Sequence, residues 1–68
     1  MDGLCRKFGA NVKRLRKEAG YSQEEFAERA AVARSYMSDI EVGRRNPTLK
    51  VVQRIASALG VSPGRLLD

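Results

Sequence analysis

Three glycines, at positions 20, 43 and 60, divide this chain of 68 residues into short stretches whose apolar residues recur at helical spacing. Glycine accepts the left-handed conformation in which helices commonly end, so each of the three marks the end of a helix. The first stretch carries one apolar stripe, about 80° wide at about 100° per residue, made of Leu4, Phe8, Val12, Leu15 and Ala19. We expect a first helix over about 4–19. No later segment alternates as a half-buried strand would, so the sequence predicts an all-α fold.

Two short helices follow each other closely after the first. Ser22, with Glu25 three residues later, forms a capping box, which satisfies two free amide donors and starts a helix over about 23–30. Residues 31–33 then lead into a third helix over 34–41, which ends before the second of the three glycines. The apolar side of this third helix consists of Met37 and Ile40.

A fourth helix begins after a polar connection. The run 44–47 ends in a proline, which disfavours helical geometry in the residue before it, and Thr48 can then cap the helix. We expect its inner face to consist of Leu49, Val52, Ile55, Ala56 and Leu59. The Ser-Pro pair at 62–63 is typical of a cap followed by a first-turn proline, and it predicts a fifth, terminal turn of helix. The chain is therefore expected to form a compact five-helix fold, with a single domain over residues 1–68.

The charge of the chain favours a polyanionic partner. Thirteen Lys and Arg residues against eight Asp and Glu residues give a formal net charge of +5, which attracts nucleic acid through long-range attraction and counterion release. The chain has no histidine and a single cysteine, Cys5, so it offers neither a Cys/His metal site nor an internal disulfide. This cysteine usage fits a reducing cytosol.

The same composition disfavours catalysis and membrane insertion. Histidine is the commonest general base near neutral pH, and the sequence carries no paired-carboxylate site, phosphate loop or nucleophile constellation in its place. We therefore expect no enzyme activity, no cofactor and no small-molecule substrate. Residues 1–10 lack the pattern of a signal peptide, and no apolar run approaches the roughly 18 residues of a membrane span. A soluble, cytoplasmic protein is expected.

The segment from Gln23 to Glu41 has the layout of a helix-turn-helix, with two helices of about two turns joined by three or four residues. Ala27 supplies the small side chain that a tight helix crossing needs. Here the sequence resembles the lambda-repressor-like family of Cro-type and XRE-like regulators, which includes phage repressors and the controller proteins of restriction-modification systems. The resemblance rests on four runs of sequence, Asn11–Arg16, Ser22–Ala27, Arg34–Glu41 and Gly43–Thr48, and the last of these is most similar to controller-type small regulators.

The resemblance implies that the third helix lies in a DNA major groove and reads base edges. Helical spacing supports this independently, because the polar residues of the helix fall on one face, opposite its apolar side. This polar face is made of Arg34, Ser35, Ser38 and Asp39. Arg34 can pair bidentately with guanine, and Ser35 can bond a base edge or a phosphate. Ser38 is either a contact or a small spacer, while Asp39 can accept from a cytosine amino group, orient Arg34 or repel phosphate.

Other residues are expected at the DNA backbone. The family uses the glutamine that matches Gln23, at the start of the second helix, to grip a phosphate, and the helix dipole assists there. Arg44, Arg45 and Asn46 sit where relatives often contact phosphate, although a solvated basic loop would also explain them. Tyr36 can present its hydroxyl to phosphate, or its ring can simply be partly buried.

Three further features concern the position of the third helix. The resemblance implies an ion pair between Arg16 and Glu41 that braces the helix. Many relatives have glycine at the position of Ala31, so alanine there implies either a positive φ or an altered turn. Ala33 stands where relatives carry a capping serine or threonine, and alanine is a poor cap, so the helix either frays at its start or offers its free amides to phosphate.

These observations predict a sequence-specific regulator of transcription that binds double-stranded DNA as a homodimer on a palindromic operator, in the cytoplasm of a bacterium or from a phage genome. Candidate dimer contacts are Val61, Leu66 and Leu67, because relatives often pair there, although these leucines can equally cover the core of one copy. A protein-interaction module of the same fold, an excised or engineered DNA-binding domain, and non-specific nucleic-acid binding by net charge remain as alternatives.

Overall fold

The computed structural model describes residues 3–68, and Met1 and Asp2, the start of the segment tested for a signal peptide, lie outside the described residues. The described chain consists of α1 (Gly3–Glu18), α2 (Gln23–Arg29), α3 (Arg34–Glu41), α4 (Leu49–Leu59) and the 3₁₀ helix η1 (Pro63–Leu67). The all-α expectation is confirmed for this part of the chain. The expectation of five α-helices is wrong, because the fifth segment is so short that it closes with i→i+3 bonds such as Arg65 N–H to Ser62 C=O at 3.0 Å.

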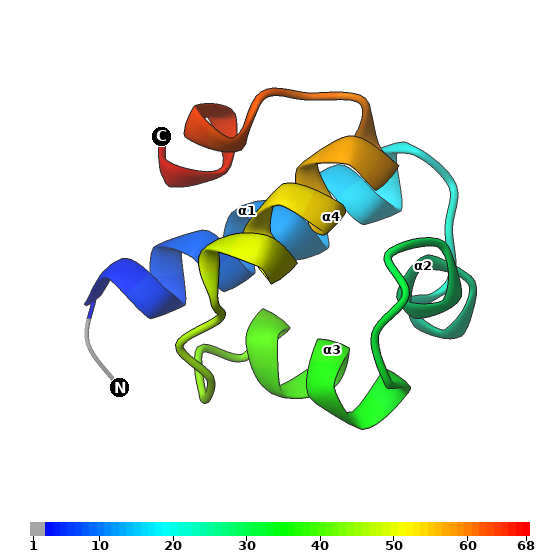
Figure 1. Ribbon diagram of the computed structural model, residues 1–68, viewed down its shortest axis with the longest axis horizontal. Helices are drawn as coiled ribbons and strands as arrows, with labels where there is room; N and C mark the ends of the chain where they lie inside the picture. The colour runs from blue at the N-terminus through cyan, green and yellow to red at the C-terminus, as the bar shows by residue number, and fades with distance from the viewer. Residues whose placement is uncertain (1–2) are drawn as a thin grey trace.

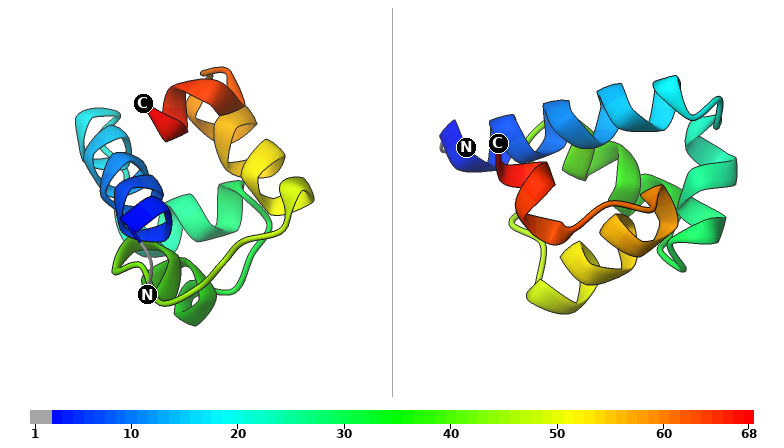
Figure 2. Two further views of the ribbon diagram at one scale, coloured as in Figure 1. Left: turned by 90° about the vertical axis from the view of Figure 1, so that its left-hand side faces the viewer. Right: turned by 90° about the horizontal axis from the view of Figure 1, so that it is seen from above.

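The helices surround one core (Figures 1 and 2). In the left view of Figure 2, α1 and α4 stand on opposite sides, α3 closes the lower end between them and η1 closes the upper end. Asn11 on α1 holds η1 in place, since its Nδ2 donates to the carbonyl of Leu66 at 2.9 Å. All five elements contribute to the core, whose largest fully buried side chains are Phe26, Met37, Ile40, Ile55, Leu66 and Val12.

The predicted apolar stripes are too long at the helix ends. Leu49 is 88% exposed and Leu4 is 61% exposed, whereas Val51, which was not expected in the core, is 8% exposed. Both leucines lie in the first turn of their helices, where the helix extends past the buried cluster. Ala19 is also exposed, because it follows the last residue of α1.

The predicted caps are present at Ser22 and Thr48, whereas Ser62, which precedes η1, makes no side-chain cap bond. The Ser22 hydroxyl accepts from the Glu25 amide at 3.1 Å, and the Ser22 amide donates to the Glu25 carboxylate at 2.9 Å. The donation from Ser22 lowers the pKa of the Glu25 carboxyl, because it stabilises the charged form. The Thr48 hydroxyl accepts from the Val51 amide at 3.2 Å. Local signals three residues apart therefore position α2 and α4 correctly.

Two glycines let α1 approach the end of α3 closely. A Cβ on Gly9, in the middle of α1, would overlap the carbonyl oxygen of Ile40 and lie 3.0 Å from that of Glu41. Gly43, just past α3, has a φ of +81°, and a Cβ there would lie 2.9 Å from Cγ of Arg6. The backbone of α1 therefore packs directly against the backbone at the C-terminal end of α3.

The expected ion pair between Arg16 and Glu41 is present and buried. Arg16 donates from Nε to one Glu41 oxygen at 2.7 Å and from Nη2 to the other at 3.0 Å. Each residue is 7% exposed. The bond to Glu41 raises the pKa of Arg16 above its usual value. Arg16 Nη1 also donates to the carbonyl of Tyr21 at 2.9 Å, and Gln23 Nε2 donates to Glu41 at 3.2 Å. One carboxylate thus joins α1, α2 and the end of α3.

The close approach at Gly9 makes a substitution there costly. Alanine is the better helix former by roughly 0.5–1 kcal/mol, but its methyl group would meet backbone atoms that cannot rotate away. We expect Gly9→Ala to lower the free energy of unfolding by about 1–3 kcal/mol, measured by urea unfolding. Gly3→Ala is the control, because within residues 3–68 no atom outside the adjoining helix backbone lies within 4 Å of the position that its methyl group would take. Equal stability of the two variants would contradict the described packing.

The buried pair predicts strongly non-additive substitutions. Each single variant, Arg16→Met or Glu41→Leu, leaves one buried charge without its partner. Each should therefore lower the free energy of unfolding by about 3–5 kcal/mol. The double variant removes both charges and should lose much less than the sum of the two. Urea unfolding with trimethylamine N-oxide in every sample keeps the weakened variants folded. Additive losses would show that the two side chains do not depend on each other.

Candidate nucleic-acid interface

Helix α3 lies at the edge of the molecule (Figure 1), and one of its sides is polar and exposed or half-buried. Met37 and Ile40 are 0% and 1% exposed, so they anchor the helix. The predicted base-reading residues lie on its other side. Arg34 and Ser35 are exposed, and Ser38 and Asp39 are half-buried. The division of α3 into two faces is therefore as predicted, with the longest polar side chain in the first turn.

The turn before α3 contains Ala31, for which the sequence allowed either a positive φ or an altered turn. Ala31 has a φ of +59°, so the first of the two alternatives for this position holds. Its amide donates to the carbonyl of Glu28 at 3.1 Å, and the amide of Val32 donates to the carbonyl of Ala27 at 3.0 Å. These two bonds form a Schellman motif, which usually has glycine at the left-handed position. They hold Ala31 in a conformation that alanine rarely adopts.

The first turn of α3 carries no side-chain cap. Ala33, the N-cap residue, has extended geometry with φ −67° and ψ 146°. Its methyl side chain cannot accept a hydrogen bond from the helix amides. An α-helix leaves its first amides without an intrahelical partner, so the amides at the start of α3 are available to an acceptor from outside. These amides lie at the N-terminus of the helix, which is the positive end of the helix dipole and therefore favours an anion.

Asp39 pairs with the arginines that follow α3. Its carboxylate lies 3.5 Å from Nε of Arg45 and 4.0 Å from Nη1 of Arg44. Within residues 3–68, the ion pairs of Asp39 are with these two arginines and not with Arg34. The expectation that Asp39 orients Arg34 is therefore not met. Both arginine side chains are more than half exposed, at 57% and 76%, so the pairs are weak and can exchange for other partners.

Tyr36 connects one of these arginines, Arg45, to the core. Its ring is half-buried against the core cluster, as one of its two expected roles requires. The guanidinium of Arg45 lies 5.1 Å from the ring centroid, within the range of a cation–π contact. Asn46 is exposed beside them. The polar loop after α3 thus places its cations next to the exposed face of the helix.

Gln23 is half-buried at the first residue of α2, where its side-chain amide is held by Glu41. A phosphate contact was predicted for this residue but its bond to Glu41 was not, because the two residues are 18 positions apart and no local spacing indicates the contact. Sequence reasoning also missed two cations on α4, Lys50 and Arg54, whose spacing of four residues on an amphipathic helix was the available signal.

Residues 3–68 have neither a cluster of metal ligands nor a membrane-spanning helix. No group of three or more His, Cys, Asp or Glu side chains there could hold a metal ion. No helix in that range combines the length and the apolar character needed to cross a membrane.

Comparison with known proteins identifies relatives of the same layout. A family model described as Helix-turn-helix matches residues 12–66. The HTH-type transcriptional regulator SinR of Bacillus subtilis is 44% identical over 61 residues, which are 88% of this chain and 55% of SinR. Control protein C.BamHI of Bacillus amyloliquefaciens is 44% identical over 62 residues, which are 90% of this chain and 76% of the control protein. The chain thus spans about half the length of SinR.

Solved structures agree with these sequence matches. The restriction-modification controller protein C.AhdI from Aeromonas hydrophila has a TM-score of 0.88 at 37% identity, and the match covers 91% of this chain and 94% of that one. A structure of SinR in complex with DNA has a TM-score of 0.85 at 44% identity and covers 90% of this chain and 98% of that one. The resemblance seen in the residues is confirmed, and the chain belongs to the helix-turn-helix family.

Proposed function

We propose that this protein regulates transcription by binding a specific sequence of double-stranded DNA, with α3 in the major groove. The observation that carries the proposal is the exposed polar face of α3, which is anchored by Met37 and Ile40 and braced by the buried Arg16–Glu41 pair. A helix that is fixed in this way can present the same side chains to each base pair it meets. The relatives named as transcriptional regulator and control protein, and the SinR structure with DNA, support the same function.

The residues of the interface divide into two roles. Arg34 and Ser35, exposed in the first turn of α3, are proposed to read base edges, and the guanidinium of Arg34 suits guanine N7 and O6. Ser38 and Asp39 lie further along the same face and complete it. Backbone contacts are proposed for Gln23, Tyr36, Arg44, Arg45 and Asn46. Phosphate can replace Asp39 as the partner of the two arginines, because their pairs with Asp39 are exposed and long.

We propose a homodimer because the proposed palindromic operator has two half-sites and one copy is too small to occupy both. Its longest extent is 27 Å, whereas successive major grooves on one side of B-DNA lie about 34 Å apart. One copy therefore cannot occupy two half-sites, and a palindromic operator needs a second copy. Among the predicted dimer contacts, Leu66 is 0% exposed and belongs to the core of one copy, while Val61 is half-buried and Leu67 is 46% exposed.

The second copy is proposed to cover an apolar patch, defined by the exposed Leu67 together with Leu4 and Leu49. These three leucines line one hollow of about 240 Å³ with Pro47 and Val52. Exposed apolar side chains gathered in one place commonly mark an interaction surface. The patch lies at the start of α4, next to the loop that carries Arg44 and Arg45. For the protein as a whole, we propose DNA binding in the cytoplasm, without catalytic activity and without a cofactor.

Selection from a library of random DNA duplexes tests the function. We expect enrichment of an inverted repeat whose half-sites are centred about 10 base pairs apart. Arg34→Ala should lose the preference at one position of each half-site, because a good bidentate contact discriminates by about 1–3 kcal/mol. Arg65→Ala removes the same charge from η1 and should keep the full preference.

Each other outcome would change a different part of the proposal. A lone half-site would contradict the dimer but not the reading of bases. Binding without any enriched sequence would indicate attraction by net charge alone, and failure to bind DNA would favour a protein-interaction module with the same fold.

A further inference from the structure

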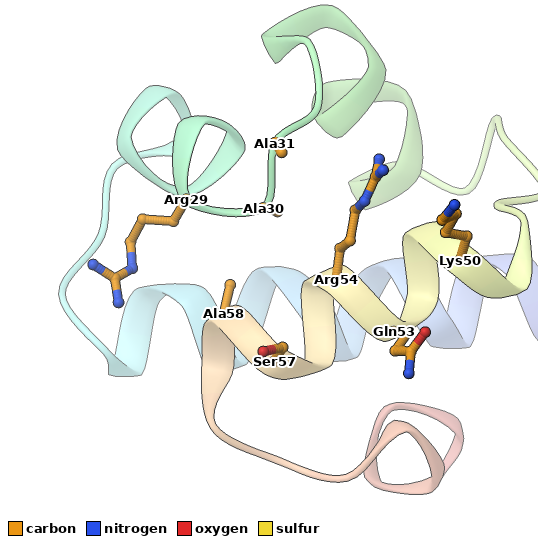
Figure 3. Close-up of a pocket in the computed structure, with 8 residues that line it drawn as sticks. All are labelled: Arg29, Ala30, Ala31, Lys50, Gln53, Arg54, Ser57 and Ala58. Carbon is orange, nitrogen blue, oxygen red and sulfur yellow. The ribbon is translucent and has the colours of Figure 1, made fainter.

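A second basic region lies beside α3, outside the interface described above. It is a hollow of about 720 Å³ between the C-terminal end of α2 and the outer face of α4 (Figure 3). Small residues, including Ala30, Ala31 and Ala58, leave space in it. We call it the α4 pocket, and its polar lining residues are Arg29, Lys50, Gln53, Arg54 and Ser57.

The cations of the α4 pocket have no acidic partner within it. Its lining contains Arg29, Lys50 and Arg54 but no Asp or Glu. The ion pairs of residues 3–68 involve other arginines, at positions 14, 16, 44 and 45. Arg29 contacts an aromatic ring instead, with its guanidinium 4.9 Å from the centroid of Tyr21. Three positive charges around one hollow repel each other, and an anion in it relieves that repulsion.

The pocket has donors of the kind that phosphate oxygens accept. Besides the three cations, the amide of Gln53 and the hydroxyl of Ser57 can donate. Lys50 and Arg54 are four residues apart, so they lie one above the other on the same face of α4. Both side chains are exposed, as is Arg29. A row of exposed cations suits a chain of phosphates that passes along the surface better than a small ligand that must be enclosed.

The position of the pocket relates it to the DNA. It includes Ala31, in the turn three residues before Arg34, the first residue of α3. Figure 3 shows Lys50 and Arg54 extending from α4 toward the side on which this turn and α3 lie. Gln23 begins α2 and Arg29 ends it, so the pocket is at the opposite end of α2 from the expected phosphate contact of Gln23.

We propose that the α4 pocket binds phosphates of the DNA backbone beside the groove that α3 enters, with Lys50 and Arg54 as the main contacts and Arg29 at the rim. This inference rests on the proposed function, because it requires α3 to lie on DNA. It adds a second line of backbone contacts to those of Gln23 and the loop after α3, and these contacts are independent of base sequence.

The salt dependence of DNA binding tests this proposal. Each phosphate contact adds about 0.9 to the slope of log affinity against log salt concentration on B-DNA. We expect the double variant Lys50→Gln/Arg54→Gln to lower that slope by about 2 on the selected operator and on scrambled DNA alike, with the enriched sequence unchanged. The matched control is Lys13→Gln/Lys17→Gln, which removes two exposed charges with the same spacing from α1 and should change the slope much less.

The possible failures are distinguishable. If Lys50→Gln/Arg54→Gln and Lys13→Gln/Lys17→Gln changed the salt slope equally, the effect would come from the net charge of the protein. This result would overturn the assignment of phosphate contacts to the α4 pocket. An unchanged slope, while the wild-type chain still selects an operator, would overturn this inference alone, whereas a wild-type chain that selects nothing would overturn the proposed function. Inorganic tripolyphosphate, followed by amide chemical shifts, tests a free anion. Tight binding that needs Lys50 and Arg54, with no effect of these residues on DNA binding, would assign the pocket to a soluble polyphosphate instead.

Discussion

The buried pair between Arg16 and Glu41 sets the distance between the longest helix and the end of α3. A pair of this kind is a weak source of net stability, because both charges lose their water. Its geometry is what matters, since the planar guanidinium bonds both carboxylate oxygens and admits few other arrangements. Gln23 donates to the same carboxylate, so the start of α2 is positioned by the group that positions α3.

The two ends of α3 differ in how firmly they are held. At the C-terminal end, Gly9 allows backbone contact with α1, and Glu41 is fixed by Arg16. At the N-terminal end, Ala33 provides no cap, and the preceding turn keeps Ala31 at a positive φ. The open end is the one that presents Arg34 and Ser35. An acceptor from DNA would supply the partner that the amides there lack, so binding and completion of the helix would coincide.

The sequence predicted features that depend on neighbouring residues. The capping box at Ser22 and the two faces of α3 follow from spacings of one or two turns, and both are confirmed. The exposure of Leu49 was missed, because periodicity does not indicate where along a helix the core ends. The 3₁₀ geometry of η1 was missed as well, since periodicity does not distinguish one turn of α-helix from one of 3₁₀ helix.

Contacts between distant residues account for the other differences. The role of Gly9, the bond from Gln23 to Glu41 and the α4 pocket each join segments that only the fold brings together. The pair of Arg16 with Glu41 is also distant, and it was predicted only because the residues at both positions match the pattern of a known family.

Amide chemical shifts of the protein, recorded as the selected operator is added, test whether α3 is the helix that reads DNA. We expect the largest changes in α3, from Arg34 to Asp39, with further changes at Gln23 and in the loop 44–46. Variants at those positions should remove the corresponding changes. If the largest changes in chemical shift fell on the outer face of α1 and α3 were unaffected, the proposal that α3 reads DNA would be contradicted.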